Sequence, residues 1–162
     1  MNHFDDIILN YKEGEMNCIE DEEVGEVIKR VCSFIDGSLD WLNPHAILLR
    51  GGEKERGEIK PHVDSIKFSG GIVAGLSLNS SRVLRLRPEV EDAGNKGYFV
   101  DLFAEKNSLY ILCDEARYSY THEIVKDESG TPWDSELEGE LCRDRFSVIF
   151  RDCKKKTDCK PD

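Results

Sequence analysis

The sequence lacks the features that mark membrane-anchored and secreted proteins. Its 162 residues contain no apolar run near the roughly 20 residues that a membrane-spanning helix needs. The start, MNHFDDIILNYKEGE, is acidic, whereas secretory and mitochondrial leaders are basic. These residues therefore predict neither an anchor nor a leader.

Cysteine pairs at the short spacing of zinc sites are also missing. The six cysteines are Cys18, Cys32, Cys113, Cys142, Cys153 and Cys159. Without a secretion signal, this arrangement does not predict a disulfide framework. We expect mostly free thiols in a reducing compartment.

Positive charge is in short supply. The chain has 22 Lys and Arg residues against 33 Asp and Glu residues, a formal net charge of -11. Such a chain repels a polyanion unless one local patch is strongly basic, so tight nonspecific binding of nucleic acid is not expected. The dense basic stretch RVLRLR, Arg82 to Arg87, is typical of an amphipathic strand with one solvated face.

The length and the 39% of hydrophobic residues predict one domain, which we place at residues 1–151, followed by a disordered tail at 152–162. An amphipathic helix is predicted before Asp36-Gly37, which supplies a stop. Its apolar face needs a sheet to cover. The residues that share this face are Val24, Val27, Ile28, Val31, Phe34 and Ile35.

From Ala46 onward the hydrophobic period changes to two, which predicts strands. The predicted strands are AILLR, IVAGLSL, RVLRL, YFVDLF, SLYIL, YSYTHEI and RFSVIF. We therefore expect a mainly β, mainly antiparallel domain with the helix packed outside. The polar segment 126–140 is expected to be a solvated loop, with a mobile lid as the alternative.

Two histidines and one aspartate form the first candidate site. In His62-Val63-Asp64, an extended backbone points both side chains to the same face. A distant histidine on a neighbouring strand, for which His122 is the candidate, would complete a two-histidine, one-carboxylate set that holds Fe(II) and leaves three positions open. The alternatives are a surface histidine beside a turn aspartate and a structural zinc site that includes Cys113.

Two arginines on one strand form the second candidate site. In RFSVIFR, Arg145, Ser147, Ile149 and Arg151 share the face opposite Phe146, Val148 and Phe150. Arginine grips carboxylates through paired hydrogen bonds, and the spacing of the two arginines suits a five-carbon dicarboxylate such as 2-oxoglutarate. The alternative is that both are solvated ends of an edge strand.

The order His62-x-Asp64, His122 and Arg145-x5-Arg151 resembles the AlkB family of Fe(II)- and 2-oxoglutarate-dependent dioxygenases. Three stretches resemble its mitochondrial subfamily, the seventh group of AlkB homologues, and the similarity extends from about Met1 to Arg151. They are GEIKPHVDSIKFSGGIVAGLSLNSSRVLRL, SLYILCDEARYSYTHEI and RDRFSVIFRD. The resemblance implies a double-stranded β-helix, or jelly-roll, with the N-terminal amphipathic helix packed on the sheet.

The resemblance also implies roles for single residues. His62, Asp64 and His122 would be the catalytic iron ligands, with 2-oxoglutarate and O2 as cosubstrates. The cosubstrate-binding residues would be Tyr110, Arg145, Phe146, Ser147 and Arg151. Arg145 would pair with the distal carboxylate and Arg151 would brace the end near the iron. Tyr110 is alternatively a core aromatic residue whose hydroxyl finds a backbone partner.

The function implied by the resemblance is hydroxylation or demethylation of a protein, RNA or metabolite substrate in the mitochondrial matrix, with a role in regulated necrosis and fatty-acid metabolism. PHAILL, Pro44 to Leu49, stands where DNA-repair relatives carry Asn-x-Tyr, and no basic hairpin is visible, so duplex DNA is not expected as a substrate. We expect a monomer. A mitochondrial protein without a leader would have a truncated or alternatively started N-terminus. The alternatives are an RNA N-methyl demethylase and a non-enzymatic interaction module that retains the iron site.

Overall fold

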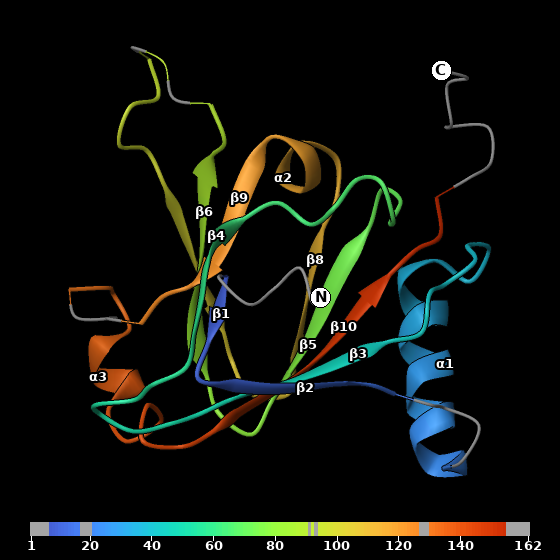
Figure 1. Ribbon diagram of the computed structural model, residues 1–162, viewed down its shortest axis with the longest axis horizontal. Helices are drawn as coiled ribbons and strands as arrows, with labels where there is room; N and C mark the ends of the chain where they lie inside the picture. Colours follow the sequence, from blue (N-terminus) through green and yellow to red (C-terminus); the bar gives the residue numbers. More distant parts are fainter. Residues whose placement is uncertain (1–6, 17–20, 91, 93, 127–129, 155–162) are drawn as a thin grey trace.

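The computed structural model describes residues 7–16, 21–90, 92, 94–126 and 130–154 (Figure 1). In this part of the chain, ten strands form two five-stranded antiparallel sheets. One sheet has the order β1-β4-β9-β6-β7, with β1 at Ile8–Leu9, β4 at Glu58–His62, β9 at Tyr120–Ile124, β6 at Arg82–Pro88 and β7 at Val100–Ala104. The other has the order β2-β3-β10-β5-β8, with β2 at Tyr11–Glu15, β3 at His45–Leu49, β10 at Arg145–Arg151, β5 at Val73–Leu78 and β8 at Ser108–Leu112.

The main hydrophobic core lies between the two sheets. Ile59, Leu84 and Ile124 from the first sheet belong to one cluster with Leu49 and Val73 from the second. Sheet strands alternate in the direction of their side chains, so each inward face contributes every second residue. The result is the predicted double-stranded β-helix, a jelly-roll of two facing antiparallel sheets.

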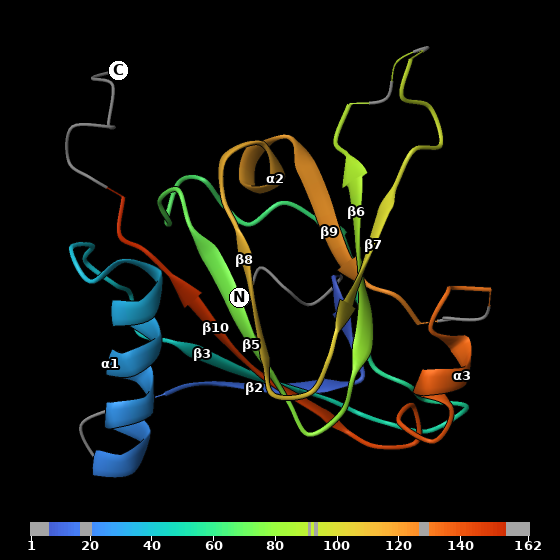
Figure 2. The ribbon, with the colours of Figure 1, turned by 180° about the vertical axis from the view of Figure 1, so that it is seen from behind.

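The predicted amphipathic helix is α1, Glu22–Asp36. It begins after Asp21, whose side chain accepts a hydrogen bond from the Val24 N–H at 3.0 Å, and it ends at Gly37. Ile28 packs with Ala74, Val148 and Phe150 on the outer face of the second sheet. Figures 1 and 2 show α1 beside this sheet.

Two residues of the predicted apolar face of α1 do not share this burial. Val27 is 51% exposed and Phe34 is 76% exposed. The α1 residues that pack on the sheet are Val24, Ile28, Val31 and Ile35. The sheet covers only part of the helix circumference, so the outermost residues of the predicted apolar face stay exposed.

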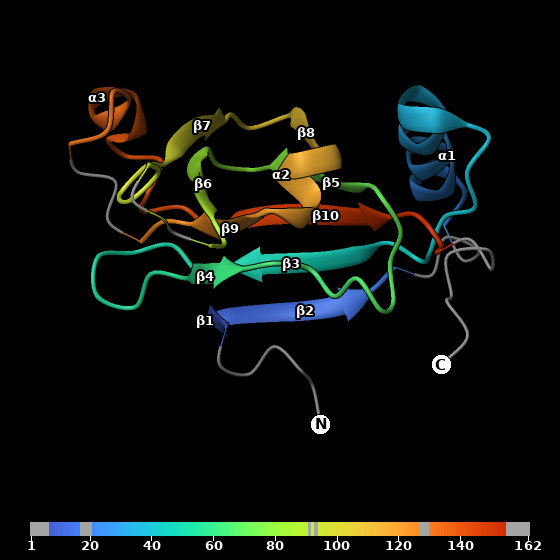
Figure 3. The ribbon, with the colours of Figure 1, turned by 90° about the horizontal axis from the view of Figure 1, so that it is seen from above.

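Several observed elements were not among the predicted helix and strands. β1 and β2 occupy the acidic N-terminal region, where YKEGE has no apolar alternation because β2 is an edge strand paired only with β3. The segment expected to be a polar loop, 126–140, contains the short helix α3, Asp134–Leu137, whose Leu137 is buried with Val83 and Val125. Figure 3 shows α3 and α1 at opposite ends of the molecule. A further short helix, α2, spans Asp114–Tyr118.

The fold continues past Arg151. Asp152 is 6% exposed, and its carboxylate accepts hydrogen bonds from the backbone N–H groups of Gly71 and Ile72 at 3.2 and 2.8 Å. Residues 155–162 of the predicted tail lie outside the described residues. None of the helices in the described ranges is long and apolar enough to cross a membrane. Cys32, Cys113, Cys142 and Cys153 are free thiols, and the other two cysteines lie outside the described ranges.

Candidate metal centre

His62, Asp64 and His122 come together between the two sheets. His62 ends β4 and His122 lies in β9, and the two residues are direct partners in the antiparallel register. Their ring centroids are 4.2 Å apart. One ligand atom from each of the three residues lies within 4.8 Å of the others, so the set could hold one metal ion.

Asp64 lies in the irregular segment just after β4, so it is not part of a continuous strand as the sequence suggested. Its Oδ1 is 3.4 Å from Nε2 of His62, and its Oδ2 accepts a 2.8 Å hydrogen bond from Nε of Arg151. Arg117, which is 2% exposed on α2, donates 2.9 Å hydrogen bonds to the backbone carbonyl of Asp64 and to Oγ of Ser69. Asp64 is therefore held in place through both its side chain and its backbone carbonyl.

The orientation of His62 suits metal binding. Its Nδ1 lies 2.8 Å from the backbone carbonyl of Lys60, so Nδ1 carries the proton in that contact. Nε2 is then the nitrogen that faces Asp64 and can offer a lone pair. Metal-bound histidines commonly use their second nitrogen in this way.

Burial and charge keep Asp64 and His122 in their ligating forms. Burial alone would raise the pKa of Asp64, but the hydrogen bond with His62 and the charge and hydrogen bond of Arg151 bring this pKa well below its ordinary value. Burial, reinforced by His62, lowers the pKa of His122 to about 3. Asp64 is thus ionised and His122 neutral at physiological pH.

The donor set fits a ferrous ion. Two neutral imidazoles and one carboxylate on one side of an ion are typical of non-haem Fe(II) sites, which keep their remaining positions open. Structural zinc prefers four protein ligands. Cys113, the sequence-based candidate for a fourth, is exposed and is not part of the group.

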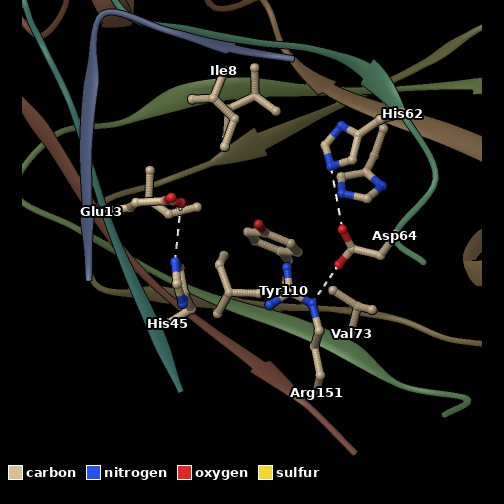
Figure 4. A pocket seen from close by; sticks show the side chains of 12 residues that line it. Ile8, Glu13, His45, His62, Asp64, Val73, Tyr110 and Arg151 are labelled. Carbon is tan, nitrogen blue, oxygen red and sulfur yellow. Dashed lines mark hydrogen bonds and ion pairs between the residues drawn. The ribbon is translucent and has the colours of Figure 1, made fainter. Parts of the chain in front are cut away.

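A pocket opens beside the three ligands (Figure 4). Tyr110 and Arg151 contribute polar groups to its wall, as do Glu13 and His45. The remaining lining residues are apolar, namely Ile8, Ile47, Ile59, Val73 and Ile149. An apolar wall with a few convergent polar groups is the usual form of a small-molecule site.

Arg145 lies deeper in the same interior. It is fully buried, and its Nε donates a 3.3 Å hydrogen bond to Oγ of Ser77. Burial raises the pKa of Tyr110, although the charge of Arg145 and a hydrogen bond with Arg145 act in the opposite direction. The phenol therefore stays protonated and can donate a hydrogen bond. Gly75 makes room for Tyr110, because a Cβ at this position would collide with the tyrosine ring.

The two arginines therefore have different surroundings. The sequence suggested that both need an external anion, but Arg151 already binds Asp64. Arg145 instead donates a hydrogen bond to Ser77, and its charge acts on Tyr110. Neither arginine is a solvated end of an edge strand, because β10 is the central strand of its sheet.

Ser147 and Phe146 lie on opposite faces of β10. Ser147 is fully buried on the inward face, and its hydroxyl has no hydrogen-bond partner within the described residues. Phe146 points the other way and packs against the cluster under α1, as the alternation of side chains along a strand requires. Its assignment to cosubstrate binding stays a prediction that follows from the resemblance alone.

Glu13 and His45 line the pocket but were not predicted as site residues. Oε2 of Glu13 lies 3.1 Å from Nε2 of His45. His45 precedes Ile47 and Leu49 at intervals of two, a signal that could have placed it on the inward face. No such signal exists for Glu13, which lies in the polar strand β2.

Comparison with known proteins relates the chain to one group of enzymes. No family model matches it. It is 39% identical over 127 residues to alpha-ketoglutarate-dependent dioxygenase alkB homolog 7, mitochondrial, of Mus musculus, and 39% identical over 128 residues to the Bos taurus protein of the same name. Each match covers 78% of this chain and 54% of the relative, so the chain spans about half the length of these relatives.

Solved structures share the fold at low sequence identity. A Pseudomonas putida prolyl-4-hydroxylase has a TM-score of 0.59 at 15% identity, covering 91% of this chain and 74% of that protein. The epimerase SnoN has a TM-score of 0.52 at 12% identity, covering 90% and 66%. OsALKBH1 has a TM-score of 0.50 at 15% identity, covering 89% and 79%.

Proposed function

We propose that this chain, which resembles the AlkB-like Fe(II)- and 2-oxoglutarate-dependent dioxygenases, is itself such a dioxygenase, with its domain at residues 1–151. The observation that carries the proposal is the convergence of His62, Asp64 and His122 beside a pocket that contains Tyr110 and Arg151. The names of the mitochondrial relatives, which include dependence on alpha-ketoglutarate, support it. SnoN, with the same fold, is described in complex with Fe3+ and alpha-ketoglutarate.

In this proposal His62, Asp64 and His122 hold Fe(II). When bound, Fe(II) and 2-oxoglutarate supply the redox chemistry, in which O2 and 2-oxoglutarate give succinate and CO2 while one oxygen atom enters a substrate C–H bond. The protein contributes position and charge. Arg151 fixes the orientation of Asp64 through Oδ2, so that Oδ1 remains directed toward His62 and the metal position.

Arg145, Tyr110 and Ser147 would bind the cosubstrate. The buried guanidinium of Arg145 suits the distal carboxylate of 2-oxoglutarate, since a charged and bidentate donor offsets the cost of burying that anion. The protonated hydroxyl of Tyr110 can donate a further hydrogen bond to it. Ser147 offers a hydroxyl on the same inward face.

The outcome for the substrate depends on which C–H bond reacts. Hydroxylation of an N-methyl group would give a hemiaminal that releases formaldehyde and leaves a demethylated nitrogen, whereas hydroxylation at another carbon would leave a stable alcohol. We extend the proposal to a protein, RNA or metabolite substrate, to the mitochondrion, and to a role in regulated necrosis and fatty-acid metabolism. We further propose that the chain acts as a monomer.

The test is succinate formation by the full chain with Fe(II), 2-oxoglutarate and O2. The unmodified chain should form succinate under these conditions. His62→Ala and Asp64→Ala should abolish this turnover. If either variant formed succinate at the normal rate, the assignment would be wrong, and metal-dependent thermal stabilisation without succinate would support a non-enzymatic module instead.

A further inference from the structure

The pocket beside the candidate metal centre has a second polar side, formed by Glu13 and His45. Figure 4 shows these two residues across the pocket from His62 and Asp64. Apart from the candidate metal ligands, Tyr110 and Arg151, they are the polar residues among the described residues that line this pocket. Neither the metal nor the cosubstrate assignment uses them.

Local structure directs both side chains into the pocket. On β2, Glu13 follows Tyr11 by two residues, and Tyr11 packs on the core between the sheets. On β3, His45 precedes Ile47, which also belongs to that core. The side chains of His45 and Glu13 are 25% and 16% exposed, so they are reachable by a ligand.

The chemistry of the pair favours a cation. An ionised carboxylate can only accept hydrogen bonds, so Nε2 of His45 is the donor in the 3.1 Å contact with Glu13. A negative charge on a largely apolar wall attracts a positive group and repels a second anion.

The interior between the two sheets carries positive charge on one side and negative charge on another. Arg145 and Arg151 place positive charge on β10, the strand that carries the proposed cosubstrate residues, whereas Glu13 places negative charge on β2, the edge strand two positions away in the same sheet. A dicarboxylate therefore favours the β10 end, and a cation favours the β2 end. A dicarboxylate and a cation would therefore bind to different side chains of this interior.

We propose that Glu13, oriented by His45, binds a cationic nitrogen group of the substrate, an ammonium or guanidinium carried by a peptide side chain. Ile8 and Ile47 on the same wall can pack against the aliphatic stem of such a side chain. The net charge of -11 favours a basic peptide over a polyanionic nucleic acid. The placement of this group beside a reacting centre rests on the proposed function, but the binding site itself does not.

A binding experiment tests the site without catalysis. N-methylguanidinium is titrated into the metal-free full chain while the imidazole proton resonances are followed by NMR, with His45 assigned through His45→Gln. The His45 resonance should shift saturably, and Glu13→Gln should weaken the apparent affinity roughly tenfold or more, as expected for the loss of one charge-assisted hydrogen bond. Glu15→Gln is the matched control, because Glu15 is an exposed carboxylate on the same strand outside the pocket lining.

Three results would overturn the inference: no saturable shift in the unmodified chain, an equal affinity in Glu13→Gln, or a stronger response to methyl phosphate than to N-methylguanidinium. The control must behave like the unmodified chain. Because no iron or 2-oxoglutarate is present, this experiment decides the inference even if the proposed dioxygenase activity fails.

A kinetic experiment then tests the substrate class. Peptides that carry dimethyl-lysine or methyl-arginine are compared with methylated oligonucleotides as stimulators of succinate formation. The peptides should stimulate turnover, and Glu13→Gln should raise their KM roughly tenfold, whereas the control Glu15→Gln should leave their KM unchanged. Stimulation by oligonucleotides alone would refute the inference and leave the dioxygenase intact, whereas the absence of any succinate would count against the dioxygenase.

Discussion

Nε of Arg151 lies 2.8 Å from Oδ2 of Asp64, so the last arginine of β10 is bound to a candidate metal ligand in the segment that follows β4, a strand of the other sheet. This contact joins the two sheets at the centre of the pocket. The other oxygen of Asp64 faces His62. Arg151 thus leaves one carboxylate oxygen for a metal ion and fixes where that oxygen points.

Removing Arg151 should therefore weaken metal binding. In Arg151→Ala the buried carboxylate of Asp64 loses its charged partner, and we expect the affinity for Mn(II), used as a redox-stable substitute for Fe(II), to fall about 10- to 100-fold. Calorimetric titration measures this. Arg30→Ala, on the exposed side of α1, is the control and should bind Mn(II) normally. Unchanged affinity in Arg151→Ala would show that the ion pair does not position the ligand.

Arg145 should affect the cosubstrate and not the metal. Its guanidinium is fully buried beside Tyr110, away from Asp64. Arg145→Ala should weaken binding of 2-oxoglutarate to the Mn(II)-loaded protein by about 2 kcal/mol or more, roughly 30-fold, while Mn(II) affinity changes little. Calorimetry measures both affinities, and circular dichroism checks that the variant folds. Equal affinity for 2-oxoglutarate would exclude Arg145 from the site.

Gly75 provides an independent test of the position of Tyr110. A Cβ on β5 at this point would collide with the tyrosine ring, so Gly75→Ala should displace Tyr110 from the pocket. We expect weaker binding of 2-oxoglutarate and a lower melting temperature, since overpacking typically costs about 1–3 kcal/mol. Gly14→Ala is the matched control, because a Cβ there meets nothing within 4 Å. Normal cosubstrate affinity in Gly75→Ala would mean that Tyr110 does not contact the cosubstrate.

The sequence predicts much of the fold because its strong signals are local. The seven predicted strand segments from Ala46 onward each overlap an observed strand, and the predicted helix matches α1 closely. The polar strand β2 gave no such signal, since edge strands are stabilised by backbone pairing with a neighbour and need no apolar alternation. Glu13 was missed with it.

In the candidate site, too, some residues carry a signal in the sequence and others do not. His62, Asp64 and His122 could be found because their residue types and order are unusual, and the structure brings them together. Phe146 packs on the side of α1, because adjacent residues of a strand face opposite ways, and its role in cosubstrate binding stays a prediction. Arg117 carried no signal at all, because its role depends on hydrogen bonds across the sequence to the loop that follows Asp64.

Arg117 should act as a positioning residue for Asp64. It donates hydrogen bonds to the Asp64 carbonyl and to Ser69, and its loss would leave these buried acceptors unpaired, at a cost of about 1–3 kcal/mol each. We expect Arg117→Met, which keeps much of the side-chain volume, to fold with a lower melting temperature and to gain less stability from Mn(II) than the unmodified chain.

Two measurements separate positioning from general destabilisation. Hydrogen exchange should become faster in the 65–69 loop than in β5 or β10, and the melting-temperature increase on adding Mn(II) should shrink, because a displaced Asp64 binds the ion less well. Leu137→Ala, in the separate cluster under α3, serves as a destabilised control that should keep the full increase. An equal increase in both variants would show that Arg117 supports the fold alone, without orienting the carboxylate.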